Sequence, residues 1–433
     1  MSAPSTVTWS AANARRMERQ FLRTPAKPGE AGPAEVVDAM LAAQAQVMSA
    51  AELSVGLRMD GATRQDVRDA LWGEEPSLVK TYGPRGTIHF LPTAELPHWT
   101  GALSAVPGGP SPFKAGDRLT PAQTEEIVSA IGDALDGVRL TIDELSEEVV
   151  ARTGPWAGDL VLPAFQGMWP RWRSVMHLAG HRGVLCFAPN RGRKVTYTRP
   201  PASEEPQPSA EVATEWLVRR FLYAYGPAQP REFAKWAAVP DGWANGVFAS
   251  LAAAGEIEAV EMDGGSSAAG ASAVAVATAA TATATATTVT APASASGSGR
   301  GSGRGSVPAS AWVVAGDTEF SAEPVRGVRL LPYFDAYVIA SHPRSRLFPG
   351  RAYERALAGG QAGNFPVLLV DGVVAGVWHQ RRSGRRLTVT VEPLDALNTT
   401  QERELAGQVE RVGEVLEGVA ELVVGRVTVG AHA

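Results

Sequence analysis

One arrangement of helices and strands occurs three times along the chain, and this repetition constrains the fold more than any single motif. Each unit begins with a long amphipathic helix, continues with a shorter helical pair and ends in two short strands. The long helices are predicted at 9–22, 121–135 and 210–225, and the strand pairs at 78–82 with 87–91, 184–188 with 194–198, and 257–262 with 311–315. Three helices followed by a hairpin describe a winged helix, so the sequence predicts three of them in tandem.

Local signals mark where these helices start and where the strands turn. Three Ser/Thr-x-x-Glu/Gln segments have the spacing of a capping box, in which two side chains satisfy the free N–H groups of a helix start. They begin at Ser49, Thr120 and Thr141. The turns GPRG at 83–86 and PNRGRK at 189–194 separate the strands of the first two hairpins.

The third hairpin is interrupted by residues 263–310, which consist almost entirely of Ala, Thr, Ser and Gly. Small side chains bury too little apolar area to offset the entropy of ordering, so we expect a solvated insertion without chemistry in the third wing.

The pattern of predicted elements changes near residue 325, where strands begin to predominate. Strands are predicted at 329–340, 367–369, 373–378, 387–391 and 420–429, with a helix at 400–416. The predicted fold class is α+β, with three tandem winged-helix domains followed by a C-terminal β-barrel-like domain. The predicted boundaries are 1–106, 107–203, 204–324 and 325–433.

Composition limits the class of protein. Of 433 residues, 45% are hydrophobic and 20% charged, which is typical of a folded protein in water. The single cysteine, Cys186, allows neither an internal disulfide nor a zinc-thiolate site. The first residues show no basic segment followed by an apolar one. We therefore expect a cytoplasmic protein, associated with the nucleoid if it binds DNA, and no membrane partner.

The formal net charge of -5 argues against nucleic acid as a partner unless the charge is segregated. It is segregated, because residues 326–386 contain many arginines and few acids, whereas the residues after 386 are acidic. This pattern is compatible with a phosphate-binding face and with an ordinary solvated surface.

Motifs for metal or cofactor chemistry do not occur. There is no HExxH, paired-cysteine, GxSxG or P-loop spacing, so neither a metal nor a cofactor is expected. The remaining candidate is Gln44-Ala45-Gln46, between the second and third predicted helices of the first unit. Residues i and i+2 share a face only in an extended segment, where two amides could position a water molecule. Taken alone, such a pair is also compatible with simple surface solvation.

The triplicated winged helix, QAQ at 44–46, RGTIHFLPT at 85–93 and LLPYFDAYVIASHPR at 330–344 together resemble the AlkZ family of DNA glycosylases, also called the YcaQ-like winged-helix family. The resemblance covers nearly the whole chain except the insertion. It implies a C-shaped protein that excises N7-alkylated purines and unhooks interstrand crosslinks. The family's catalytic motif is Gln-apolar-Gln, or Gln-apolar-Asp in the YcaQ branch. Here it falls on Gln44 and Gln46, although Ala45 is smaller than the aliphatics usual at the middle position.

The resemblance implies a monofunctional hydrolysis. Alkylation at N7 makes the purine a good leaving group, so catalysis mainly needs a positioned water and stabilisation of positive charge on the sugar. We assign Gln46 to holding the water and Gln44 to assisting it or contacting the deoxyribose. No lysine lies close in sequence to form a Schiff base.

Further DNA contacts are expected from basic residues in each unit. Arg85 and His89 lie in the first wing, Arg171 and Arg173 in the second unit, and Arg231 and Lys235 in the third. His89 could equally be a satisfied hairpin residue, and the others could belong to solvated helix faces. Phe334 and Asp335 are expected to form a buried turn at a domain junction.

The predicted partner is double-stranded DNA that carries alkylated purines, bound by a monomer. Two alternatives stay open: a noncatalytic winged-helix regulator that binds a defined DNA sequence, and a protein-interaction scaffold that does not bind DNA.

Overall fold

The fold is described from a computed structural model, which covers residues 6–108, 114–164, 167–203, 205–263, 309–357 and 359–430. Most of the predicted insertion, residues 264–308, lies outside the described residues. Its predicted ends do not: Asp263 accepts a hydrogen bond from the Trp9 N–H at 3.0 Å, and Ala309 and Ser310 belong to a strand. None of the described helices is long and apolar enough to cross a membrane.

The first unit places a short strand between its first two helices. Its elements are α2 (Pro33–Ala39), β2 (Ala43–Gln44), α3 (Met48–Gly56), α4 (Arg64–Trp72), β3 (Leu78–Tyr82) and β4 (Ile88–Pro92). The sheet order is β2-β4-β3, and all neighbours are antiparallel. Apolar side chains of the helices and of Leu78 and Phe90 form one core.

The second unit repeats this order of elements. Its elements are α6 (Pro121–Ala134), β5 (Leu140–Thr141), α7 (Ile142–Thr153), η4 (Arg171–Val175), α8 (Met176–His181), β8 (Cys186–Arg191) and β9 (Lys194–Thr198). The sheet order β5-β9-β8 matches that of the first unit. A separate hairpin of β6 (Leu160–Ala164) and β7 (Gly167–Pro170) is inserted before η4.

The third unit has the same plan with a minimal first strand. Its elements are α9 (Ala210–Tyr225), α10 (Pro230–Ala237), α11 (Asp241–Ala253), β10 (Ile257–Met262) and β11 (Ala309–Val314). A single bridge from Ala228 to Trp312 stands where the other units have β2 and β5. Helix α5 (Leu96–Ala105), which follows the first unit, shares the apolar core of α9.

The helix predicted at 9–22 forms, but its apolar face packs against the C-terminal region. Helix α1 (Trp9–Arg19) buries Ala14 and Met17 in a core with Val325 and Tyr337 of the C-terminal region. The first helix of the repeat is therefore α2. The amphipathic pattern of residues 9–22 predicts a buried face correctly but does not identify the partner of that face.

Two of the three predicted capping boxes are confirmed. The side chains of Thr120 and Thr141 cap α6 and α7. The box predicted at Ser49 is wrong, because α3 begins at Met48 after an extended Val47 without a side-chain cap. Its expected partner, Glu52, is buried and forms an ion pair with Arg68 at 2.6 Å.

The C-terminal region is an open five-stranded sheet. Its elements are β12 (Val328–Leu331), α12 (Ala336–Ala340), α13 (Arg344–Leu347), α14 (Arg351–Ala356), β13 (Val367–Val370), β14 (Val373–Ser383), β15 (Arg386–Pro393), α15 (Thr399–Val415) and β16 (Val419–Val424). The order β12-β13-β14-β15-β16 leaves β12 and β16 as edges, so the predicted barrel is a curled half-barrel. The predicted strand over 329–340 ends early, because the Asp335 side chain caps a helix over 336–340.

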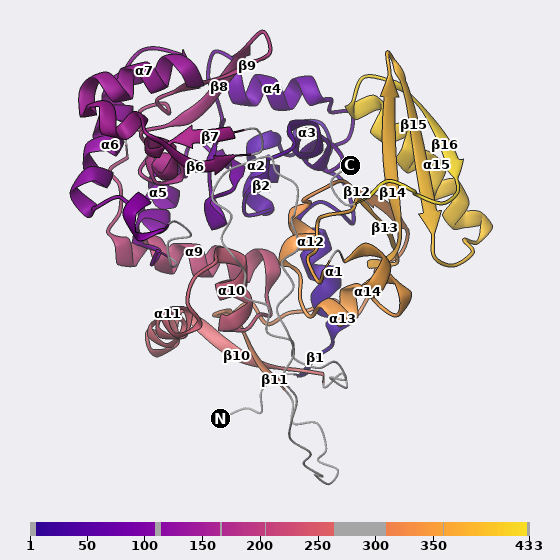
Figure 1. Ribbon diagram of the computed structural model, residues 1–433. Coiled ribbons are helices and arrows are strands. Elements are labelled where there is room, and N and C mark those ends of the chain that lie inside the picture. The colour runs from indigo at the N-terminus through magenta and orange to yellow at the C-terminus, as the bar shows by residue number, and fades with distance from the viewer. Residues whose placement is uncertain are drawn as a thin grey trace, which may run out of the picture.

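The second unit and the C-terminal sheet lie on opposite sides of the molecule in Figure 1, and β2 and α10 lie between them. Helix α1 runs beside α12, consistent with their shared core.

Candidate functional site

Both glutamines follow a sharp turn at the end of α2. Leu41 and Ala42 have φ values of 52° and 81°, a left-handed conformation that costs a non-glycine residue of order 1–3 kcal/mol. The Ala42 N–H donates to the carbonyl of Val37 at 3.0 Å, and the Tyr225 hydroxyl donates to the carbonyl of Met40 at 2.5 Å. The turn is thus held by its own helix and by α9 of the third unit.

Beyond the turn the backbone is extended, as the spacing of the glutamines predicts. Gln44 pairs with His89 of β4. Ala45 is 1% exposed and belongs to the core of the first unit, so Gln44 and Gln46 share the opposite face. Gln44 is buried and Gln46 is exposed. The pair therefore reaches from the inside of the protein to its surface.

Arg85 connects this pair to the third unit. The Gln44 Nε2 donates to the Gln46 Oε1, and the Arg85 Nη2 donates to the Gln44 Oε1 at 2.9 Å. The second guanidinium nitrogen, Nη1, donates to the carbonyl of Trp236 on α10 at 2.6 Å. Arg85 lies in the turn η1 (Pro84–Gly86) between β3 and β4. Burial lowers its pKa to about 10, so the side chain is charged at neutral pH.

His89 does not face a ligand. It is 4% exposed, and its Nδ1 lies 2.9 Å from the carbonyl oxygen of Thr87. Burial, and then the charge of Arg85, lower its pKa to about 3, so the imidazole is neutral. A side chain at Gly83 would approach the imidazole within 2.8 Å. This burial favours the alternative of a satisfied hairpin residue, and the predicted DNA contact of His89 stays a prediction.

Arg171 and Arg173 lie together on η4 of the second unit. Arg171 donates weakly to Asp159 and to the carbonyl of Gly116, at 3.5 and 3.4 Å. The Arg173 guanidinium stacks on the Trp169 ring with its Cζ 3.9 Å from the centroid. Both side chains are half-buried and keep donors free for a ligand, so their predicted DNA contacts stay predictions.

Arg231 and Lys235 occupy one face of α10, four residues apart. Both are exposed, and neither forms an ion pair with a described residue. Trp236, the neighbour of Lys235, accepts the hydrogen bond from Arg85. The helix that carries these two cations therefore contacts the turn that holds Arg85, which the sequence alone does not show.

A model of the family described as DNA glycosylase AlkZ-like matches residues 37–415. This chain belongs to the AlkZ-like DNA glycosylases. The match spans all three units and most of the C-terminal sheet, so DNA is the substrate class and the predicted resemblance is confirmed.

Two relatives come from Streptomyces sahachiroi. The interstrand DNA cross-link repair glycosylase is 28% identical over 383 residues, which are 86% of this chain and 87% of the relative. The solved structure of the DNA glycosylase AlkZ is similar with a TM-score of 0.71 at 25% identity, covering 97% of this chain and 100% of the other. The AlkZ-like fold thus includes the C-terminal sheet and the three units together.

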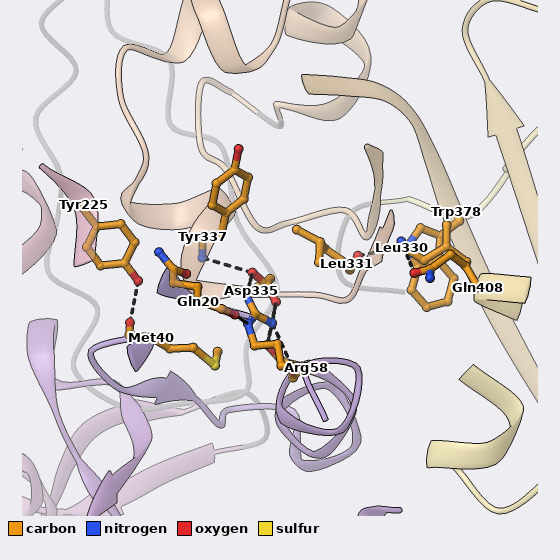
Figure 2. A network of polar contacts seen from close by, with 11 residues as sticks. Gln20, Met40, Arg58, Tyr225, Leu330, Leu331, Asp335, Tyr337, Trp378 and Gln408 are labelled. Atoms are coloured by element: carbon orange, nitrogen blue, oxygen red, sulfur yellow. Dashed lines mark hydrogen bonds and ion pairs between the residues drawn. The ribbon is translucent and has the colours of Figure 1, made fainter. Parts of the chain in front are cut away.

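Asp335, from the segment at 330–344 that resembles the family, forms buried contacts at the predicted domain junction of this AlkZ-like chain. Figure 2 shows its carboxylate facing Arg58, which follows the C-terminal end of α3. The two side chains are fully buried and form two hydrogen bonds, of 2.8 and 2.9 Å. Ser54 donates to the same carboxylate at 2.6 Å, and the Tyr337 N–H donates at 3.1 Å. The role is structural, as predicted.

The predicted arginine-rich face is not one surface in this AlkZ-like protein. Arg329 and Arg344 donate to backbone carbonyls, and Arg355 forms an ion pair with Glu392 at 2.9 Å. The exposed group at the turn between β14 and β15 comprises Arg381, Arg382, Arg385 and Arg386.

Among the described residues, no group of three His, Cys, Asp or Glu could hold a metal ion.

Proposed function

We propose that this AlkZ-like glycosylase hydrolyses the N-glycosidic bond of N7-alkylated purines in duplex DNA, with Gln44 and Gln46 as its catalytic residues. The observation that carries the proposal is the hydrogen-bonded Gln pair, which is anchored inside the protein at Gln44 and exposed at Gln46. A pair serving only surface solvation would not need a half-buried cation to hold it.

Two neutral amides are sufficient for hydrolysis of this N-glycosidic bond. Alkylation at N7 gives the purine a positive charge, so the base departs readily and positive charge develops on the deoxyribose. The Oε1 of Gln46 has a lone pair left after accepting from Gln44, and it can orient the attacking water. Gln44 keeps one N–H for the water or the sugar. Positioning supplies the acceleration, since neither amide takes up a proton near neutral pH.

Bulky and crosslinked lesions are the proposed substrates. Gln46 is exposed on an extended segment, and neither a surface cavity of about 540 Å³ nor one of about 240 Å³ is lined by it. An open site admits an adduct or a second strand that a closed base pocket would reject. The cross-link repair relative, which matches most of this chain, supports this choice.

We further propose that the three units are winged-helix domains, bounded near residues 1–106, 107–203 and 204–324, ahead of a C-terminal domain at 325–433. The common order of elements, the matching sheets of the first two units and the bridge from Ala228 to Trp312 in the third support this division, with α1 as an arm that reaches the C-terminal sheet. Arg171, Arg173, Arg231 and Lys235 are the proposed phosphate contacts, and the protein is proposed to act as a monomer.

A monofunctional reaction is proposed because of where the lysines lie. Lys80 pairs with Phe90, whereas Thr81 pairs with His89, which also pairs with Gln44. Lys80 therefore lies on the sheet face opposite Gln44. Lys235 is the lysine to test, since it is exposed beside the residue that Arg85 contacts.

The test uses purified protein and a duplex oligonucleotide with one N7-methylguanine. The proposal predicts free N7-methylguanine, an intact abasic strand and no covalent adduct with borohydride. An adduct that Lys235→Ala abolishes would replace hydrolysis by a lyase reaction. Tight binding to one DNA sequence without base release would favour the winged-helix regulator, and no DNA binding would favour the protein scaffold.

A further inference from the structure

The contacts of Arg85 fix which atom of each glutamine is the oxygen. Amide oxygen and nitrogen are assigned from hydrogen bonding, and a guanidinium can only donate. The Gln44 atom 2.9 Å from Arg85 Nη2 must therefore be its Oε1. The other end of that amide, the NH₂ group, faces Gln46, so the Gln46 atom that it meets must be the acceptor Oε1.

The contacts of Arg85 are hydrogen bonds to neutral groups and not ion pairs with carboxylates of the described residues. Among the described residues no carboxylate forms an ion pair with it, and it donates to the Gln44 amide and to the Trp236 carbonyl. Its φ of 64° is left-handed, a conformation that favours glycine. Backbone strain and a half-buried cation without a charge partner occur together at one residue that contacts the Gln pair, which indicates a functional constraint.

We propose that Arg85 is a positioning residue that sets the hydrogen-bond polarity of Gln44 and, through it, of Gln46. This inference rests on the catalytic role proposed for the Gln pair. The chain of donors runs in one direction, from Arg85 to Gln44 to Gln46. This chain of hydrogen bonds fixes the orientation of the Gln46 amide, so its free Oε1 lone pair and its NH₂ group each keep one position at the surface.

The polarity makes the two glutamines unequal. Position 44 must accept from Arg85 and donate to residue 46, which an amide can do and a carboxylate cannot. Position 46 only has to accept from Gln44 and from water. Gln46→Glu is therefore expected to keep the single-turnover rate within about 10-fold of the unmodified protein, and Gln44→Glu to lose at least about 100-fold.

The experiment measures single-turnover release of N7-methylguanine from a duplex at saturating enzyme, with the full chain. Arg85→Met should lower the maximal rate about 10- to 100-fold and leave the half-saturating enzyme concentration within about 2-fold. Arg85→Lys, which keeps a donor and the charge, should recover part of that rate. Thr81→Val is the matched control, because it removes the 2.8 Å hydrogen bond from Thr81 to the Leu185 carbonyl and loosens the same hairpin without touching the glutamines. Its rate should stay within about 2-fold.

Two results would overturn the inference. One is an unchanged maximal rate in Arg85→Met, or an equal loss in Thr81→Val. The other is a loss that vanishes at saturating enzyme while the salt dependence of DNA binding falls by about one unit of slope, which marks a phosphate contact.

A second readout separates this inference from the proposed function. Side-chain amide NMR of protein labelled with ¹⁵N-glutamine identifies Gln44 as the signal missing in Gln44→Glu. The Gln44 signal should move in Arg85→Met and not in Thr81→Val. If the unmodified protein releases no base, the proposed function fails, and an unmoved signal would overturn the positioning role as well.

Discussion

Arg58 and Asp335 form a buried ion pair that joins the segment after α3 to the C-terminal region. Both side chains are 0% exposed, and Asp335 also accepts hydrogen bonds from Ser54 and Tyr337. Removal of one partner leaves the other charge buried without compensation, which typically costs about 3–5 kcal/mol.

Asp335→Ala is therefore expected to lower the free energy of unfolding by about 3–5 kcal/mol in urea denaturation. Arg58→Met/Asp335→Ala, which removes both charges, should recover part of that loss. A change below about 1 kcal/mol in the single variant would contradict the structural role of the pair.

Individual residues differ in how far the sequence reveals them. The spacing of Gln44 and Gln46 predicts a shared face, because extended backbone alternates its side chains. The bond from Arg85 to Gln44 spans 41 residues and the pair of Arg58 and Asp335 spans 277. No local pattern encodes such contacts, since they depend on how separate units meet.

At the scale of elements, the β3–β4 hairpin lies between α8 of the second unit and α10 of the third. The His181 Nε2 on α8 lies 3.0 Å from the carbonyl oxygen of Gly83 in this hairpin, and because a carbonyl only accepts, the nitrogen carries the proton. Burial, with a smaller contribution from His177, lowers the pKa of His181 to about 4.

This depressed pKa gives the hairpin contact a pH dependence. Below about pH 6.5 the unfolded chain takes up a proton that the folded His181 refuses, so stability is full above that pH and falls toward pH 4. At about pH 5 the loss attributable to His181 is about 2 kcal/mol. His181→Gln should flatten this part of the curve of unfolding free energy against pH. An unchanged slope between about pH 7.5 and pH 5 would contradict the assignment.

The elements themselves are largely predictable, and the exceptions have physical causes. Hairpins with Gly- or Pro-rich turns and helices with Thr capping boxes occur where predicted. Residues 336–340 form a helix, because the Asp335 side chain caps it, although AYVIA is rich in strand-forming residues. This cap is local, but Arg58 holds the Asp335 carboxylate from 277 residues away, and such tertiary contacts override local propensity.

On the scale of the whole molecule, the sequence predicts which units exist but not how they face one another. The helix α10, which carries the exposed Arg231 and Lys235, contacts the turn of Arg85 through the Trp236 carbonyl. The charge segregation seen in the sequence does not survive as one surface, since several arginines between 326 and 386 bind carbonyls or carboxylates internally.

Arg231 and Lys235 should therefore contribute to DNA affinity through phosphate contacts. Arg231→Gln/Lys235→Gln is expected to weaken DNA binding at moderate salt and to reduce the slope of log affinity against log salt by about two. Fluorescence anisotropy with an undamaged duplex measures both. An unchanged slope would assign the two side chains to a solvated helix face.

Gln44 and Gln46 are proposed to perform base excision, and release of N7-methylguanine from a duplex measures this activity. The unmodified protein and the exposed control Gln65→Ala should release the base at equal rates, and Gln44→Ala/Gln46→Ala should release it at least about 100-fold more slowly with the same melting temperature. Full activity in the double variant, or none in the unmodified protein, would contradict the claim.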